Sequence, residues 1–117
     1  MTLDDIAREL ELVELVPPNE VQRAAEVTRG YASDLLSDVL AHAPADGVLV
    51  TLQVHLNVIA VAGHADLAAV IFAGGRQPDE EVVAKAAQEG LALYGCTADT
   101  FEIAGRLYAL GVKGSRA

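Results

Sequence analysis

Apolar residues along this chain alternate between short unbroken runs and helix-like repeats. Residues 48–52 and 67–73 are almost entirely apolar, which is typical of parallel strands buried on both faces. After each run, apolar residues recur every three or four positions, as on the buried side of a helix. The pattern therefore predicts repeated strand–helix units.

Turn and cap residues set the boundaries of these elements. Thr2 precedes a helical repeat, Pro17-Pro18-Asn19 ends a strand, and Ser33 or Asp34 can cap the next helix. Residues 19–26 are polar and predict no element. In chain order, the predicted elements are a helix over 3–10, strands over 12–16 and 26–31, a helix over 35–42, strands over 48–52 and 67–73, a helix over 78–89, a strand over 91–94 and a helix over 101–110.

Residues 54–63 are ambiguous between a helix and a strand. Their β-branched side chains favour a strand. However, they join two predicted parallel strands, and such strands need a crossover connection of about a dozen residues. We therefore expect a helix here. The fold class that follows is α/β, a three-layer α/β/α arrangement with a mostly parallel sheet of four to five strands.

Charge and composition exclude several classes of function. The chain has 117 residues, enough for one domain, and a net charge of −9 with only eight Lys and Arg residues. Nucleic acids and anionic membrane surfaces require clustered basic side chains, so neither is an expected partner. The single cysteine, Cys96, cannot form an internal disulfide, and we expect a cytoplasmic protein.

Polar residues gather where the predicted strands end. Because parallel strands end at one edge of a sheet, ligands collect there. The alternative is that these residues are ordinary caps and turns. The candidate ligand-binding residues are Ser33, Asp34, Gln53, His55, Asn57, Gly74, Gly75, Arg76, Thr97 and Thr100.

Each group within this set has two interpretations. His55 and Asn57 lie in the most apolar part of the chain, so His55 either contacts a ligand or is a buried histidine bonded to backbone. The sequence Gly74-Gly75-Arg76 is either an anion cradle or a simple turn. The chain has no GxxxxGK[ST] or GxGxxG motif. We expect no metal site, because the three histidines lack zinc-ligand spacing.

Four segments of the chain, residues 30–40, 51–62, 74–81 and 100–108, together resemble the stand-alone DRTGG-domain proteins. The resemblance extends over about residues 20–112. The string that names the family is absent, and Ala73-Gly74-Gly75 is its nearest remnant.

The resemblance implies an α/β fold like the N-terminal domain of HPr kinase/phosphorylase, and a sensing or docking module that is often dimeric. It supplies no catalytic residues. We therefore expect a single domain over 1–117 with a frayed tail at 113–117, no cofactor and a homodimer.

The expected function is a non-catalytic regulatory module that binds an anionic metabolite or nucleotide at the strand ends. One alternative is a protein-interaction or dimerisation domain. A second is a small hydrolase or transferase that uses His55 and Asp34, although no GxSxG motif accompanies them.

Overall fold

The computed structural model describes residues 1–115, which form an α/β fold with five strands and six helices. In chain order these are α1 (Leu3–Glu9), β1 (Val13–Val16), α2 (Glu20–Ala24), β2 (Gly30–Ala32), α3 (Leu36–His42), β3 (Val48–Thr51), α4 (Asn57–His64), β4 (Ala69–Phe72), α5 (Glu80–Glu89), β5 (Ala92–Gly95) and α6 (Thr100–Ala109).

The five strands form one sheet in the order β1-β5-β4-β3-β2. The strands β2 to β5 are parallel, and β1 runs antiparallel to β5 at one edge. Each parallel connection contains one helix, as crossover geometry requires. The mostly parallel sheet predicted from the sequence is confirmed.

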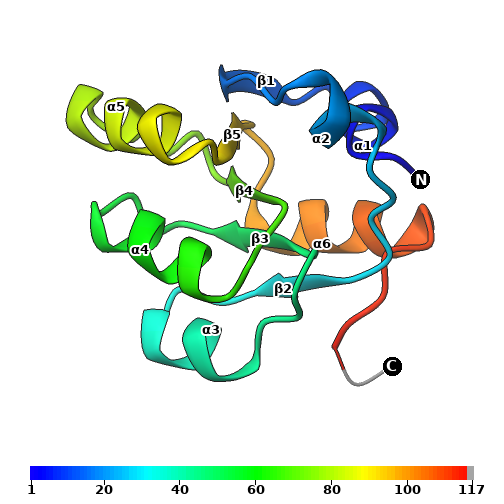
Figure 1. Ribbon diagram of the computed structural model, residues 1–117. Coiled ribbons are helices and arrows are strands. Elements are labelled where there is room, and N and C mark those ends of the chain that lie inside the picture. The colour runs from blue at the N-terminus through cyan, green and yellow to red at the C-terminus, as the bar shows by residue number, and fades with distance from the viewer. Residues whose placement is uncertain (116–117) are drawn as a thin grey trace.

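Helices cover both faces of this sheet (Figure 1). On one face, α1 and α6 pack against side chains such as Val48, Val50 and Tyr94. On the other, α3, α4 and α5 pack against the alternate side chains, including Leu49 and Phe72. Burying one such aliphatic side chain stabilises the fold by roughly 1.5–3 kcal/mol. Two apolar cores therefore hold the sheet in place.

Helix capping explains an element that the hydrophobic pattern does not predict. The Asn19 side chain accepts a hydrogen bond from the Gln22 amide, and the Gln22 side chain accepts one from the Asn19 amide. This reciprocal capping box starts α2 within the polar segment 19–26. The helix buries no residue of its own, so apolar periodicity could not reveal it.

Residues 54–63 are helical from Asn57 onward, as predicted. The predicted strand over 26–31 is misplaced, because β2 begins only at Gly30. The residues before it bond elsewhere: the Val27 amide donates to the Met1 carbonyl, and the Thr28 carbonyl accepts from the Lys113 amide.

The predicted frayed tail is ordered in its first part. Lys113 pairs with Arg29 in a parallel bridge, and its carbonyl accepts a hydrogen bond of 2.8 Å from the Gly30 amide. Val112 before it is buried. Backbone pairing therefore extends the order of the chain past α6, and residues 116–117 lie outside the described residues.

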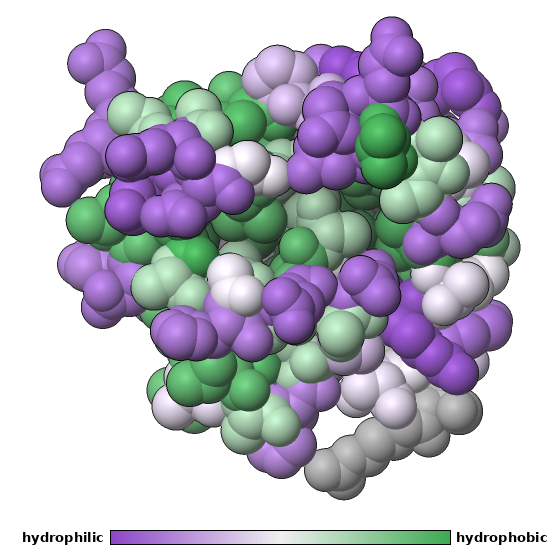
Figure 2. All heavy atoms as spheres, viewed as in Figure 1, coloured by the Kyte–Doolittle hydropathy of each residue, from purple (hydrophilic) through white to green (hydrophobic). Residues whose placement is uncertain are grey.

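The surface carries several exposed apolar side chains, and apolar residues gather over α3 in Figure 2. Hydrophilic residues surround them over most of the same view. Within the described residues, none of the helices is long and apolar enough to cross a bilayer. The large exposed apolar side chains are Val13, Val21, Leu35, Leu40, Phe101 and Tyr108.

Tyr94 provides a test of how the core tolerates a polar atom. Its side chain is fully buried, and its hydroxyl has no hydrogen-bond partner among residues 1–115. Burial, with a smaller contribution from Glu14, raises the pKa of Tyr94 to about 12. An unpaired buried hydroxyl costs free energy, so Tyr94→Phe should leave the free energy of unfolding unchanged or raise it by about 1 kcal/mol.

Urea unfolding of the two proteins measures this difference. The control is Tyr108→Phe, since Tyr108 is exposed and should change stability by less than about 0.5 kcal/mol. A loss of stability in Tyr94→Phe would show that the hydroxyl has a buried partner, such as an ordered water.

Candidate functional site

The ten candidate residues follow the carboxyl ends of β2, β3, β4 and β5, which lie side by side in the sheet. They come from four separate loops and helix starts, as the parallel topology requires. Several of their polar atoms, however, bond to neighbouring backbone. The ten residues therefore lie at one edge of the sheet, the rim, and several of them stabilise the loops at that edge.

Asp34 joins the end of β2 to the end of β3. Its Oδ1 accepts hydrogen bonds from the Thr51 hydroxyl (3.0 Å) and the Leu52 amide (2.7 Å). Thr51 is fully buried, so this carboxylate satisfies a donor that water cannot reach. The expectation that Asp34 caps α3 is wrong, because its side chain faces β3 instead.

Ser33 and Gln53 support the same junction. The Ser33 amide donates to the Val50 carbonyl, and its hydroxyl accepts a hydrogen bond from the Leu35 amide. Gln53 reaches the Asp34 carbonyl at 3.5 Å, a long contact. Ser33 therefore forms a local turn, and α3 begins after Leu35 with no side-chain cap.

His55 and Asn57 are both exposed, and they lie before and at the start of α4. The His55 Nδ1 accepts a hydrogen bond of 3.0 Å from the Asn57 amide. The interpretation of His55 as a buried core histidine is therefore wrong, since the apolar run around it bends into a loop here. Its ring supports the start of α4, and its Nε2 has no hydrogen bond within the described residues.

Gly74 and Gly75 both adopt left-handed backbone conformations, with φ of 65° and 71°. Their amides donate to the carbonyls of Ala98 (2.7 Å) and Cys96 (2.8 Å), which ties the end of β4 to the loop after β5. Two consecutive left-handed residues explain the glycine pair. Because both amides are engaged, they cannot cradle an anion in this conformation, and Arg76 is the cationic group left at this turn.

The loop after β5 leads into α6. Asp99 caps the helix, accepting a hydrogen bond of 2.8 Å from the Glu102 amide. Thr97 is exposed, whereas the Thr100 hydroxyl is buried with no partner in the described part of the chain. Cys96 beside them is partly buried, and that burial raises the pKa of its thiol, so it is not an activated nucleophile.

A groove of about 430 Å³ lies at this end of the rim, between the start of β1, the end of β5 and α6. Two of the predicted residues line it, Gly75 and Thr97, and Arg106 supplies a cationic wall. Its volume falls in the range of small-ligand sites, about 300–1,000 Å³. The other lining residues are Leu10, Glu11, Val13, Leu15, Gln77, Gly95, Cys96 and Ala98.

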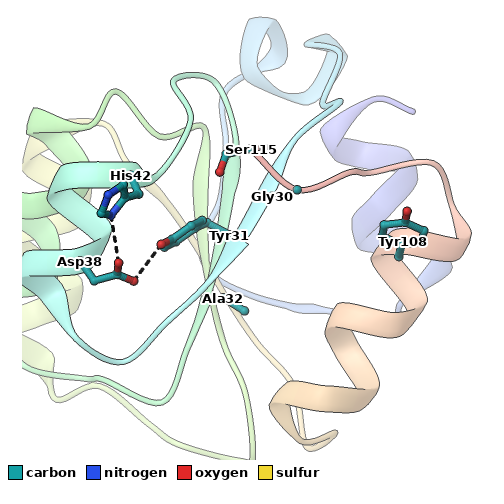
Figure 3. Close-up of a pocket in the computed structure, with 8 residues that line it drawn as sticks. Gly30, Tyr31, Ala32, Asp38, His42, Tyr108 and Ser115 are labelled. Carbon is teal, nitrogen blue, oxygen red and sulfur yellow. Dashed lines mark hydrogen bonds and ion pairs between the residues drawn. The ribbon is translucent and has the colours of Figure 1, made fainter. Parts of the chain in front are cut away.

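A second groove, of about 580 Å³, lies along the outer edge of β2 (Figure 3). The Tyr31 hydroxyl donates to Asp38 Oδ2 (2.8 Å), and His42 Nδ1 lies 3.0 Å from Asp38 Oδ1. Tyr108 of α6 stands on the opposite side of β2. The candidate set from the sequence does not include Asp38, His42 or Tyr108.

The polar side of this groove is electrostatically coupled. The hydrogen bond from Tyr31 is the largest cause of a lowered Asp38 pKa, followed by the Ser33 hydroxyl, and the His42 ring contributes less. Asp38 and His42 are four residues apart on α3, which is the spacing of facing side chains on a helix. The sequence therefore predicts that Asp38 and His42 face each other. It does not predict the contact with Tyr31, which lies on β2.

Comparison with known proteins supports the fold. No known family model matches the sequence, and no curated protein matches it. A similar solved structure contains the CBS and DRTGG domains of the regulatory region of a Clostridium perfringens pyrophosphatase, complexed with its activator diadenosine tetraphosphate. The TM-score is 0.71 at 17% sequence identity, over 95% of this chain and 47% of that chain. This chain thus spans about half of that structure and has a DRTGG-like fold.

The role of Asp34 predicts a stability effect. Asp34→Ala should lower the free energy of unfolding by roughly 1–3 kcal/mol, because the buried Thr51 hydroxyl loses its acceptor. Asp34→Asn keeps an oxygen at the same position and should lose less. Urea unfolding measures both, with the exposed Asp46→Asn as the control. An unchanged stability in Asp34→Ala would mean that the carboxylate is not part of the fold.

The Tyr31–Asp38 bond predicts a pH effect. The pKa of Asp38 is lowered in the folded state, so its contribution to stability is present above the ordinary pKa of about 3.9 and is lost as pH falls through the folded value. Tyr31→Phe should raise the Asp38 pKa toward the ordinary value and reduce this loss. Carboxyl NMR titration measures it. An unchanged Asp38 pKa would exclude Tyr31 as its main donor.

Proposed function

We propose that this chain, with its DRTGG-like fold, is a non-catalytic regulatory domain that binds a small anionic ligand of the nucleotide class. The proposed site is the rim at the ends of β4 and β5. The observation that carries this proposal is the Arg76 guanidinium, which has no partner among residues 1–115 and follows the left-handed turn at Gly74 and Gly75 in a chain of net charge −9.

Arg76 differs from the other Lys and Arg side chains of residues 1–115. Each of those has a partner: a carboxylate for Arg8, Arg23, Lys85 and Arg106, the Gly114 carbonyl for Arg29, and the Tyr108 ring for Lys113. Arg76 is exposed and has no side-chain partner in this part of the chain. An acidic protein that leaves one cation unpaired at a strand end presents a natural anion contact.

The neighbouring groove gives such a ligand room. Gly75 and Gln77, which flank Arg76, line the groove together with Thr97 and Arg106. The phosphates of a nucleotide would lie against Arg76 and Arg106, and its base and sugar against the apolar walls from Leu10, Val13 and Leu15. Glu11 also lines the groove, which disfavours a second anionic group at its β1 end.

The non-catalytic part of the proposal is supported by how the nucleophile and base candidates are used. Asp34 bonds to β3, and His55 bonds to the start of α4, with no hydrogen bond between them in the described residues. A hydrolytic pair requires such contact or a bridging water. The similar pyrophosphatase structure is itself a regulatory region, which supports a regulatory role for this chain.

Thermal-shift measurements with diadenosine tetraphosphate, ATP and inorganic triphosphate test the proposal. A ligand present at about 100 times its Kd stabilises the folded state by about 2.7 kcal/mol and should raise Tm by several degrees. Arg76→Ala and Arg106→Ala should each weaken binding about tenfold. Lys85→Ala, on α5, is the control and should bind normally.

Two results would overturn this function. One is the absence of any Tm shift with all three compounds at about 5 mM, a concentration that exceeds ordinary regulatory Kd values. The other is conversion of the nucleotides at an ordinary enzymatic rate, roughly 1 s⁻¹ or more, followed by chromatography of the same samples.

A protein-interaction domain is the second candidate function. The outer edge of β2 is open between α3 and α6, and exposed Leu40 and Tyr108 lie on those two helices. Exposed apolar side chains beside an open strand edge are typical of binding surfaces for protein segments.

A further inference from the structure

We propose that the outer edge of β2 binds an extended basic segment of a partner protein, which adds to the sheet as a strand between α3 and α6. This inference deepens the interaction function given above as the second candidate. It is independent of the anionic-ligand site, which lies at the rim near β4 and β5. Backbone groups, two hollows and local charge together define the segment.

The backbone of β2 has unused hydrogen-bonding groups. Arg29 and Ser33 bond to β3, through the Arg29 carbonyl (3.1 Å) and the Ser33 amide (3.2 Å). Backbone groups alternate in direction along a strand, so those of Ala32 point away from β3. Among residues 1–115 they have no partner. A new strand would therefore find an amide and a carbonyl ready to pair.

The two edges of the sheet differ in how well they are protected. At the β1 edge, a bulge falls between Glu14 and Val16, and Arg23 holds the Glu14 carboxylate at 2.6 Å. Bulges and charges are devices that prevent pairing at an edge. The sequence of β2 is Gly-Tyr-Ala, with neither device. Among residues 1–115, the Lys113 carbonyl accepts a hydrogen bond from the amide of Gly30, the first residue of β2.

A small apolar hollow lies on the α6 side of this edge. Its volume is about 170 Å³, smaller than a typical ligand site. Gly30 and Ala32 leave the space open, because neither has a large side chain. The hollow has room for one aliphatic side chain of an added strand. Its lining residues include Val50, Ala104, Leu107, Tyr108 and Val112.

The α3 side of the edge is wider and contains the acidic group. Tyr31 points toward α3, where its hydroxyl donates to Asp38, and Asp38 in turn lies 3.0 Å from His42 Nδ1 (Figure 3). Neighbouring residues of a strand point to opposite faces. An added strand that places an aliphatic side chain in the α6 hollow therefore places its next side chain beside Asp38.

Charge complementarity identifies that next side chain as basic. The Asp38 carboxylate has about four lone-pair positions and bonds to the Tyr31 hydroxyl, the Ser33 hydroxyl and the His42 ring. One position therefore remains for a Lys or Arg donor. The low pKa of Asp38 keeps it ionised near neutral pH. Two cations of residues 1–115 near this groove bond elsewhere, since Lys113 Nζ lies 3.8 Å from the Tyr108 ring centroid and Arg29 donates to the Gly114 carbonyl.

A second copy of the chain fits this edge less well. Each copy has a net charge of −9, and two-fold antiparallel pairing of β2 would place both α3 helices, with their Asp38 carboxylates, on the same face. The segment from Lys113 to Ser115, which lines the grooves beside Gly30, would also meet the incoming strand of the other copy. A basic partner segment avoids the charge repulsion.

A synthetic heptapeptide, acetyl-Lys-Val-Lys-Val-Lys-Val-Lys-amide, is the probe, titrated against the full chain and followed by amide NMR. We expect saturable binding with a Kd below about 1 mM, with the largest shifts at Gly30 and Ala32. The Glu-Val counterpart should bind about tenfold more weakly or not at all. A version of the basic peptide with proline in place of its central valine should also lose about tenfold.

Two variants of the protein test the two contacts separately. Ala32→Pro removes the outward amide while leaving the bonds to β3, and it should weaken the basic peptide about tenfold. Ala32→Ser keeps the amide and is its control. Asp38→Asn should weaken the peptide about threefold to tenfold. Circular dichroism checks that each variant is folded. If Ala32→Pro does not fold, Asp38→Asn and the proline peptide still test the two contacts.

The proposal is overturned by any of three results: no binding of the basic peptide at about 2 mM, equal binding of the acidic peptide, or binding that survives both the Ala32→Pro change and the proline peptide. Sedimentation that shows a dimer dissociated by Ala32→Pro would assign the edge to a second copy and also overturn it. Arg76→Ala should leave peptide binding unchanged, so a failure here is distinct from a failure of the nucleotide site.

Discussion

Burial of β3 and β4 on both faces is the constraint on which the rest of this structure depends. All eight residues of these two strands are buried, so each strand needs apolar cover above and below. Two separate cores supply it, one under α1 and α6 and the other under α3, α4 and α5. With both faces covered, polar chemistry is confined to the strand ends and to the edges of the sheet.

Polar groups at the strand ends are needed both to complete the fold and to contact a ligand, and the first need limits the second. The loops there must satisfy backbone groups left where strands stop, and the Asp34 carboxylate and the Gly74 and Gly75 amides do so. A side chain that completes the fold has little freedom to contact a ligand. The Arg76 side chain does not take part in the fold in this way, because the turn is held by the backbone hydrogen bond from the Arg76 amide to the Ala73 carbonyl. A chemically useful rim residue is therefore one that the fold leaves unpaired.

Much of the fold could be predicted from the sequence, because continuous apolar runs and helical repeats report burial directly. The helix over 54–63 is such a case, settled by the length of the crossover. The helix α2 and the pairing of Lys113 could not be predicted, since they arise from a capping box and from a contact across 84 residues. The same holds for the candidate site. The positions of its loops could be predicted from the topology, but the hydrogen-bond partners of Asp34 and His55 could not.

The Tyr31–Asp38–His42 group shows why a site at a sheet edge is difficult to predict from the sequence. Asp38 and His42 look like an ordinary surface pair on a helix, and Tyr31 looks like a strand residue at the rim. Only the strand order, with β2 last in the sheet, places all three at an open edge. A parallel sheet built by successive crossovers in one direction must end in such a strand. Here the two sides of the edge differ, since one is lined by apolar residues and the other contains the Asp38 carboxylate.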